Sequence, residues 1–174
     1  MPGIKITFKK GKKMNKKIRS TVSAALAIIL LLLTFLVSCT GELPSEGEVT
    51  VLVEVSEGEY LTYPVTLSNI EDKSRGAVSI LEYLGSLSEN KLEYDIVNST
   101  YGAYVNSIGP LVPVGNQYIS VYTSVESEFS VPTADMPVVS SVVWEGVTLK
   151  YCRVGLSSMT VTDGTVILFR LESF

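Results

Sequence analysis

The sequence predicts an α+β domain in which one mixed sheet packs on one main helix, after an N-terminal signal segment. Three observations predict this fold class. Several short segments alternate apolar and polar residues, and a period of two is typical of strands with one face on a core. One segment, residues 77–87, has its apolar residues at helical spacing instead. A basic N-terminal stretch precedes an uncharged apolar run at residues 22–37, which is the order found in export signals.

The first 38 residues have the properties of an export signal. They hold eight of the 14 Lys and Arg residues and none of the 18 Asp and Glu residues. The apolar run ends in Leu36-Val37-Ser38-Cys39, which resembles the lipobox of bacterial lipoproteins, where the cysteine is acylated and becomes the new N-terminus. We therefore expect a signal peptide at residues 1–38. We expect Cys39 to carry the lipid and to anchor the chain to the membrane on its extracytoplasmic side.

Two alternatives concern this signal. Met14 is followed by a short basic region of its own, so translation could begin there. The apolar run could also be an uncleaved membrane anchor, although it is shorter than the ~20 residues that a transmembrane helix needs. A lipoprotein and an uncleaved anchor would both place the remaining domain outside the membrane.

The part of the chain after the signal is strongly acidic. Six Lys and Arg residues stand against all 18 Asp and Glu residues, which gives it a net charge of −12. Such a charge repels nucleic acid and anionic lipid headgroups. We therefore exclude nucleic acid as a partner.

A hairpin opens the domain, which we expect at residues 48–174 after a polar tether at 39–47. Residues 49–56 alternate between apolar and polar side chains, and residues 61–68 do so again after a Glu-Gly-Glu turn. Pro64 cannot donate a main-chain hydrogen bond, so the second strand is predicted near an edge of the sheet.

The main helix follows this hairpin. Ala77, Ile80, Leu81, Leu84 and Leu87 fall on one helical face. Strand signals then resume at residues 92–96, 103–105, 118–125, 138–143, 147–152 and 165–171. Asp163-Gly164 is predicted as a hairpin turn between the segments that flank it. The residues expected to be buried in the core are Val51, Val53, Leu81, Leu84, Ile167 and Phe169.

The residue types present argue against an enzyme. The chain contains no histidine, which removes the usual general base and the imidazole metal ligands. Cys152 is the only cysteine besides Cys39, and a buried, inert thiol is the preferred interpretation over a reactive or intermolecular one. The closely spaced acidic pairs are interpreted as solvated loops rather than as calcium or glycosidase sites; they are Glu57/Glu59, Glu71/Asp72 and Glu126/Glu128. We predict no catalytic residue, no metal ligand and no cofactor.

Aromatic residues are the candidates for a binding site. Tyr101, Tyr104, Tyr118 and Tyr122 fall close together in the sequence, and tyrosine combines a flat apolar ring with a hydrogen-bonding end. We predict that these four rings line a shared cleft with Trp144 at its rim. The alternative is that tyrosines are common here because they suit strands.

The segment from residue 48 to residue 172 resembles the transcobalamin-like C-terminal domain of many bacterial surface proteins and lipoproteins. Residues 102–109, 118–124 and 155–164 carry this resemblance. It implies a β-grasp-like fold, in a group associated with the binding of soluble ligands. In animal vitamin carriers, a domain of this kind covers one side of cobalamin. The chain departs from the pattern at Ile119, where many relatives have Trp, and at Gly109-Pro110, where relatives often have Asn-Gly or Asp-Gly.

Together these features predict a lipid-anchored, extracytoplasmic binding module for a small molecule or a glycan, with a cobalamin-like ligand as the least supported option. The alternative is a structural or protein-interaction domain of the cell envelope that has no small ligand.

Overall fold

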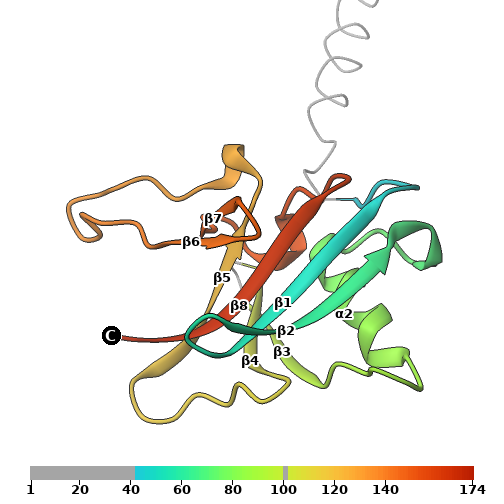
Figure 1. The fold of residues 1–174 in the computed structure, drawn as a ribbon, viewed down its shortest axis with the longest axis horizontal. Helices are drawn as coiled ribbons and strands as arrows, with labels where there is room; N and C mark the ends of the chain where they lie inside the picture. Colours follow the sequence, from blue (N-terminus) through green and yellow to red (C-terminus); the bar gives the residue numbers. More distant parts are fainter. Residues whose placement is uncertain (1–41, 100–101) are drawn as a thin grey trace, which may run out of the picture. The chain divides into compact units, whose positions relative to one another are not determined.

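A six-stranded sheet forms the body of the domain (Figure 1). The computed structural model describes residues 42–99 and 102–174. The sheet order is β2-β1-β8-β5-β7-β6, in which β1 and β8 run parallel and all other neighbours run antiparallel. The strands are β1 (Glu48–Ser56), β2 (Glu59–Thr66), β5 (Gln117–Thr123), β6 (Ser141–Trp144), β7 (Val147–Tyr151) and β8 (Thr165–Ser173).

The remaining elements lie between these strands in the sequence. β3 (Tyr94–Ser99) and β4 (Gly102–Ile108) pair with each other in a separate two-stranded sheet. The helix α2 (Ala77–Ser86) is ten residues long. Three single turns of 3-10 helix complete the described part of the chain: η1 (Leu67–Asn69), η2 (Glu126–Glu128) and η3 (Leu156–Ser158).

The main core lies between α2 and one face of the large sheet. Val51 and Val53 on β1 and Ile167 and Phe169 on β8 are buried there, and so are Leu81 and Leu84 on α2. The predicted burial of these six residues is confirmed. The first hairpin is confirmed as well, and β2, which carries Pro64, is an edge strand of the sheet as expected.

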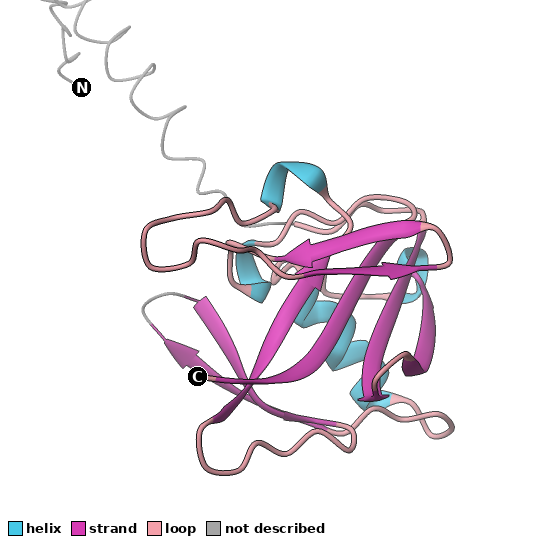
Figure 2. Cartoon of the chain, turned by 60° about the vertical axis from the view of Figure 1, so that its left-hand side comes forward, coloured by secondary structure: helices cyan, strands magenta, loops and turns pink. Residues whose placement is uncertain are grey.

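A second apolar cluster lies on the other face of the same sheet. It consists of Leu52, Tyr122, Leu149, Val166 and Leu168, with Tyr60 and Trp144 among the partly buried side chains around it. The central strands β1 and β8 therefore bury side chains on both faces of the sheet. The sheet curls around this second cluster, and Figure 2 shows the curvature of its strands.

The predicted α+β, β-grasp-like fold, with a mixed sheet packed on one main helix, is wrong. The domain is mostly β, with a six-stranded sheet curled into a half-barrel, a second small sheet and one short helix. The apolar spacing of residues 77–87 identified the helix, but spacing does not tell how much of a sheet a helix covers. A ten-residue helix covers only part of one face, and side chains of β6 and β7 pack over the other face.

The Asp163-Gly164 turn also differs from the prediction, because it does not join two hairpin strands. The Gly164 N–H donates to the Glu48 carbonyl oxygen at 2.8 Å, and the Glu48 N–H donates to Asp163 Oδ1 at 2.8 Å. The turn thus holds the start of β8 beside the start of β1, from where the two strands run parallel.

The described end of the predicted tether packs against the domain. The Leu43 side chain is buried in the main core, and its N–H donates to the Lys73 carbonyl oxygen at 3.0 Å. The domain therefore begins to make contacts before β1.

Candidate ligand-binding cleft

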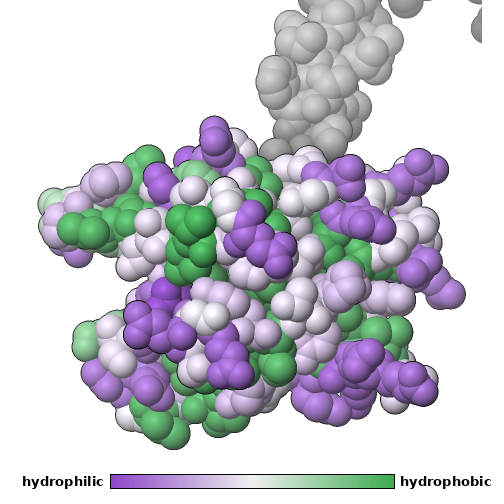
Figure 3. Space-filling model, viewed as in Figure 1, coloured by the Kyte–Doolittle hydropathy of each residue, from purple (hydrophilic) through white to green (hydrophobic). Residues whose placement is uncertain are grey.

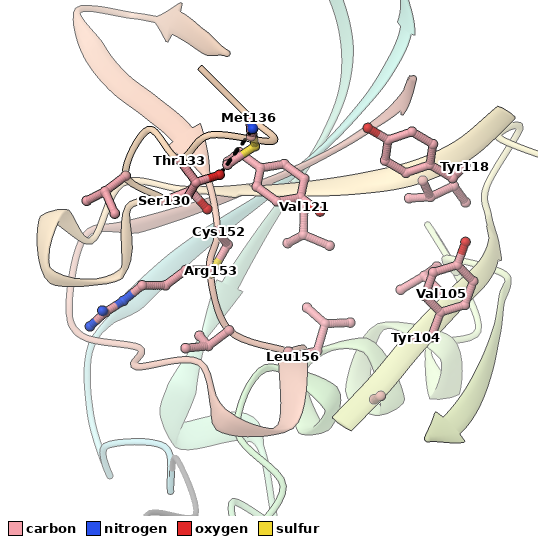
Figure 4. A pocket seen from close by; sticks show the side chains of 16 residues that line it. Tyr104, Val105, Tyr118, Val121, Ser130, Thr133, Met136, Cys152, Arg153 and Leu156 are labelled. Atoms are coloured by element: carbon pink, nitrogen blue, oxygen red, sulfur yellow. Dashed lines mark hydrogen bonds between the residues drawn. The ribbon is translucent and has the colours of Figure 1, made fainter. Parts of the chain in front are cut away.

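A cleft of about 460 Å³ lies between β4, β5, the loop after η2 and the segment that leads into η3 (Figure 4). Tyr104 and Tyr118 stand on one side of it. Ser130, Thr133 and Met136, all from the loop between η2 and β6, stand on the other side. Its inner surface is mostly apolar and includes Ile119, Val121, Val154 and Leu156.

Tyr104 lines this cleft from β4, together with Ala103 and Val105. Its neighbours on β4, Ala103 and Val105, are buried in the main core. Successive side chains of a strand point to opposite faces, so Tyr104 points away from that core, and its side chain is 48% exposed. The ring is held at the cleft by its strand, while much of its surface stays accessible.

Tyr118 is held in place by two contacts with the C-terminal strand. Its hydroxyl group donates to Glu172 Oε2 at 3.0 Å. Its ring stacks on the Phe174 ring, with centroids 4.8 Å apart and an angle of 25° between the planes. Burial, followed by the hydrogen bond to Glu172, raises the pKa of Tyr118 to about 12, so its phenol is neutral at physiological pH.

Tyr151, at the end of β7, also lines the cleft, and the sequence analysis did not select it. Burial, followed by the charge of Glu172, raises the pKa of its phenol. Tyr104, Tyr118 and Tyr151 line the same cleft. The sequence offered only one signal for Tyr151, which was its position in a predicted strand, because it is far from the other tyrosines in the sequence.

The structure brings together only part of the predicted set. Tyr104 and Tyr118 share the cleft. Tyr122 does not line it: its ring is fully buried in the second cluster, and its hydroxyl donates to Glu172. Trp144 does not line it either, since it packs against the second cluster from β6. Tyr101, like the predicted lipid carrier Cys39, lies outside the described residues.

Tyr122 and Trp144 both differ from the prediction because they pack in and against the second cluster. Tyr122 shares strand parity with Tyr118, but the curled sheet buries that face along most of β5. On that face only Tyr118, at the beginning of the strand, reaches the cleft, while Ile119 and Val121 line it from the opposite face of β5. The predicted function of Tyr104 and Tyr118 as ligand contacts remains a prediction.

Two buried groups lie beside the cleft. Cys152 is a free, buried thiol, as predicted. Burial raises its pKa to about 11, from an ordinary value of 9.0. Glu128 was interpreted as part of a solvated pair, and this is wrong: η2 turns it inward, where it is 6% exposed and its Oε1 accepts a hydrogen bond from the Thr160 N–H at 2.7 Å.

The Cys152 thiol is expected to react very slowly with a disulfide reagent such as DTNB. At pH 8, a pKa of about 11 rather than 9.0 lowers the thiolate fraction roughly 100-fold, and burial slows access further. The measurement uses the full-length chain with Cys39→Ser, in which Cys152 is the remaining thiol. It compares the rate of the DTNB reaction in the native chain with the rate in the guanidinium-unfolded chain. Equal rates in the two states would show that the thiol is open to solvent.

The described residues contain neither a metal cluster nor a membrane-spanning helix. Within 42–99 and 102–174, no group of three or more Cys, Asp or Glu side chains is placed to hold a metal ion. The same part of the chain has no helix that is long and apolar enough to cross a membrane.

Comparison with solved structures gives only distant likenesses. No protein-family model matches the chain, and no curated protein does. A 1.30 Å crystal structure of a "putative metal binding protein" from Ruminococcus gnavus ATCC 29149 aligns with a TM-score of 0.46 and 14% sequence identity. The alignment covers 74% of this chain and 99% of that protein. A likeness at this level assigns neither a family nor a function to the chain.

Proposed function

We propose that the chain is a lipid-anchored, extracytoplasmic binding module whose ligand site is the cleft between β4, β5 and the loop after η2. The observation that carries this proposal is the cleft itself. Its volume of about 460 Å³ falls in the range of small-molecule sites, and an apolar surface with a few convergent polar groups is typical of such sites. The signal-like segment and Cys39 support the anchored, extracytoplasmic location.

The aromatic side of the cleft supports binding more than catalysis. Tyr104, Tyr118 and Tyr151 offer ring surface and hydroxyl groups, and the raised pKa of Tyr118 and Tyr151 keeps those two phenols neutral. A general base or a nucleophile needs a pKa near the working pH. The raised pKa of the Cys152 thiol is far from that range.

Replacing Tyr104 by alanine is expected to weaken ligand binding about tenfold without unfolding the domain. The ring offers both contact surface and a hydroxyl group, and its 48% exposure makes its loss tolerable for the fold. A ligand-observed NMR screen of a small-molecule library against the full-length chain in detergent micelles would supply the ligands to titrate.

The matched control for this experiment is Val97→Ala. Val97 pairs directly with Tyr104 across the β3–β4 hairpin and is similarly exposed, but it does not line the cleft. This variant should bind like the unchanged chain. A screen whose every hit is insensitive to Tyr104→Ala would place the ligand elsewhere and refute the proposed site.

A second candidate function is protein interaction in the cell envelope. The loop between η2 and β6, which we call the arm, carries Val131 and Val138, whose exposed fractions are 65% and 78%. Apolar surface gathers on this arm in Figure 3. Exposed apolar patches of this kind are common at protein–protein contacts. If Tyr104→Ala has no effect on any ligand, this arm is the better candidate for the functional surface.

A further inference from the structure

We infer that the cleft selects a neutral, polyhydroxylated ligand of sugar size. This inference rests on the proposed function and names the class of ligand for the same site. Three properties of the cleft lead to it: its charge, its hydrogen-bonding groups and its rings.

The charges around the cleft disfavour an anion. Arg153 is the only charged residue among the described residues that line it, and its side chain points away from Tyr104 and Tyr118 (Figure 4). Two carboxylates lie just behind the lining. Glu172 accepts the hydroxyl of Tyr118, and Glu128 lies within 3.9 Å of the Cys152 sulfur. A bound anion would meet their negative potential without an inward-pointing cation to offset it.

The same surroundings do not supply a cation site. Glu172 is directed to phenol hydroxyls and lies 4.0 Å from Arg170 Nε. Glu128 is directed to the Thr160 N–H and the Cys152 thiol. Neither carboxylate lines the cleft, and the hydrogen bonds that both already accept leave neither directed at a bound cation. A ligand without formal charge therefore fits best.

The polar groups of the cleft are of mixed type. Tyr118 gives its proton to Glu172, so its oxygen remains an acceptor for a ligand. Thr133 Oγ1 already accepts the Met136 N–H at 3.1 Å, so its own proton remains available for donation. A ligand hydroxyl can both donate and accept, so polyhydroxylated molecules match such a mixture in several orientations.

The ring arrangement suits a flat ligand with one apolar face. Phe174 and Glu172 fix the orientation of Tyr118 before any ligand arrives, which lowers the entropy cost of stacking against it. Val121 and Leu156 form apolar surface between the two sides of the cleft. The C–H face of a pyranose ring can pack on an aromatic ring while its hydroxyls reach the polar groups around it.

The test compares trisaccharides of similar size and different charge. The full-length chain is prepared in a polyoxyethylene detergent, which has neither sugar nor charge, and is titrated calorimetrically with N-acetylglucosamine, glucosamine and galacturonic acid trisaccharides. The neutral N-acetylated trisaccharide should bind at least about tenfold more tightly than its cationic and anionic counterparts. Tyr118→Ala should weaken this binding about tenfold, and Phe174→Ala, which frees the Tyr118 ring, about threefold. Val97→Ala is the control, and circular dichroism verifies the fold of each variant.

The outcomes separate this inference from the proposed function. If a charged trisaccharide or a corrinoid such as cobinamide binds more tightly than the neutral sugar, and Tyr104→Ala weakens that binding, the site stands and the ligand class is wrong. If neutral sugars bind as tightly to the Tyr104→Ala and Tyr118→Ala chains as to the unchanged chain, the inference is wrong as well. If the three trisaccharides, cobinamide and the whole small-molecule library fail to bind, both the inference and the proposed function are wrong.

Discussion

Replacing Phe169 by alanine is expected to lower the free energy of unfolding by roughly 3–5 kcal/mol. Phe169 is fully buried on β8, where it pairs with Val53 on one side and Val121 on the other. The substitution removes a large ring from the middle of the sheet and leaves a cavity that its paired neighbours cannot readily fill. Guanidinium unfolding of the full-length chain, followed by circular dichroism, measures the change.

The C-terminal phenylalanine provides a matched control. Phe174→Ala removes a ring that is 90% exposed, so its cost should not exceed about 1 kcal/mol, the scale of one aromatic pair. If Phe169→Ala does not fold, Phe169→Leu retains most of the volume and should cost less than about 1.5 kcal/mol. Equal effects of the two alanine substitutions would contradict the described packing of β8.

Replacing Cys39 by serine is expected to abolish lipidation and maturation of the chain altogether. Lipidation requires the thiol as the acylated nucleophile, and a hydroxyl group is a much weaker nucleophile. In a bacterial host, the unchanged chain should incorporate a labelled fatty acid and partition into detergent. The Cys39→Ser chain should incorporate no fatty acid and should keep its signal segment, because maturation is blocked.

Cys152→Ser is the matched control for this experiment, since it removes the other cysteine from a buried position. It should leave fatty-acid incorporation unchanged. Mass spectrometry of the purified protein identifies the N-terminus directly. An unmodified N-terminus upstream of residue 39 in the unchanged chain would instead support an uncleaved anchor.

Strand alternation predicted which side chains share a face, but not what covers that face. The alternation of Val51 and Val53 indicated one buried face of β1, and both are buried. Leu52 between them is equally buried, because β1 lies inside the sheet and the sheet curls over its second face. The same curl buries Tyr122. Alternation within one strand contains no information about such curvature, which depends on strands far apart in the sequence.

The cleft was predictable only from its aromatic side. Tyr104 and Tyr118 were found because tyrosines cluster in that part of the sequence. The opposite side comes from Ser130, Thr133 and Met136, in a loop without periodicity, and from the segment before η3. These segments meet because β5 pairs with both β7 and β8, and that pairing has no local signal. Glu128 is a similar case, since its partner Thr160 is 32 residues away.

If Cys39 is acylated as proposed, the burial of Leu43 limits how far the domain can lie from the membrane. Between an acylated Cys39 and the buried Leu43, the chain has four residue steps, which span at most about 14 Å when fully extended. The domain would then stay within a thin layer above the headgroups and move with the lipid in two dimensions. An anionic leaflet would repel a domain with a net charge of −12. This repulsion would keep the short connecting segment extended and limit the tilts that the domain can adopt. Ligands would have to reach this layer to be captured, so long polymers fixed elsewhere in the envelope would be sampled only at their membrane-proximal ends.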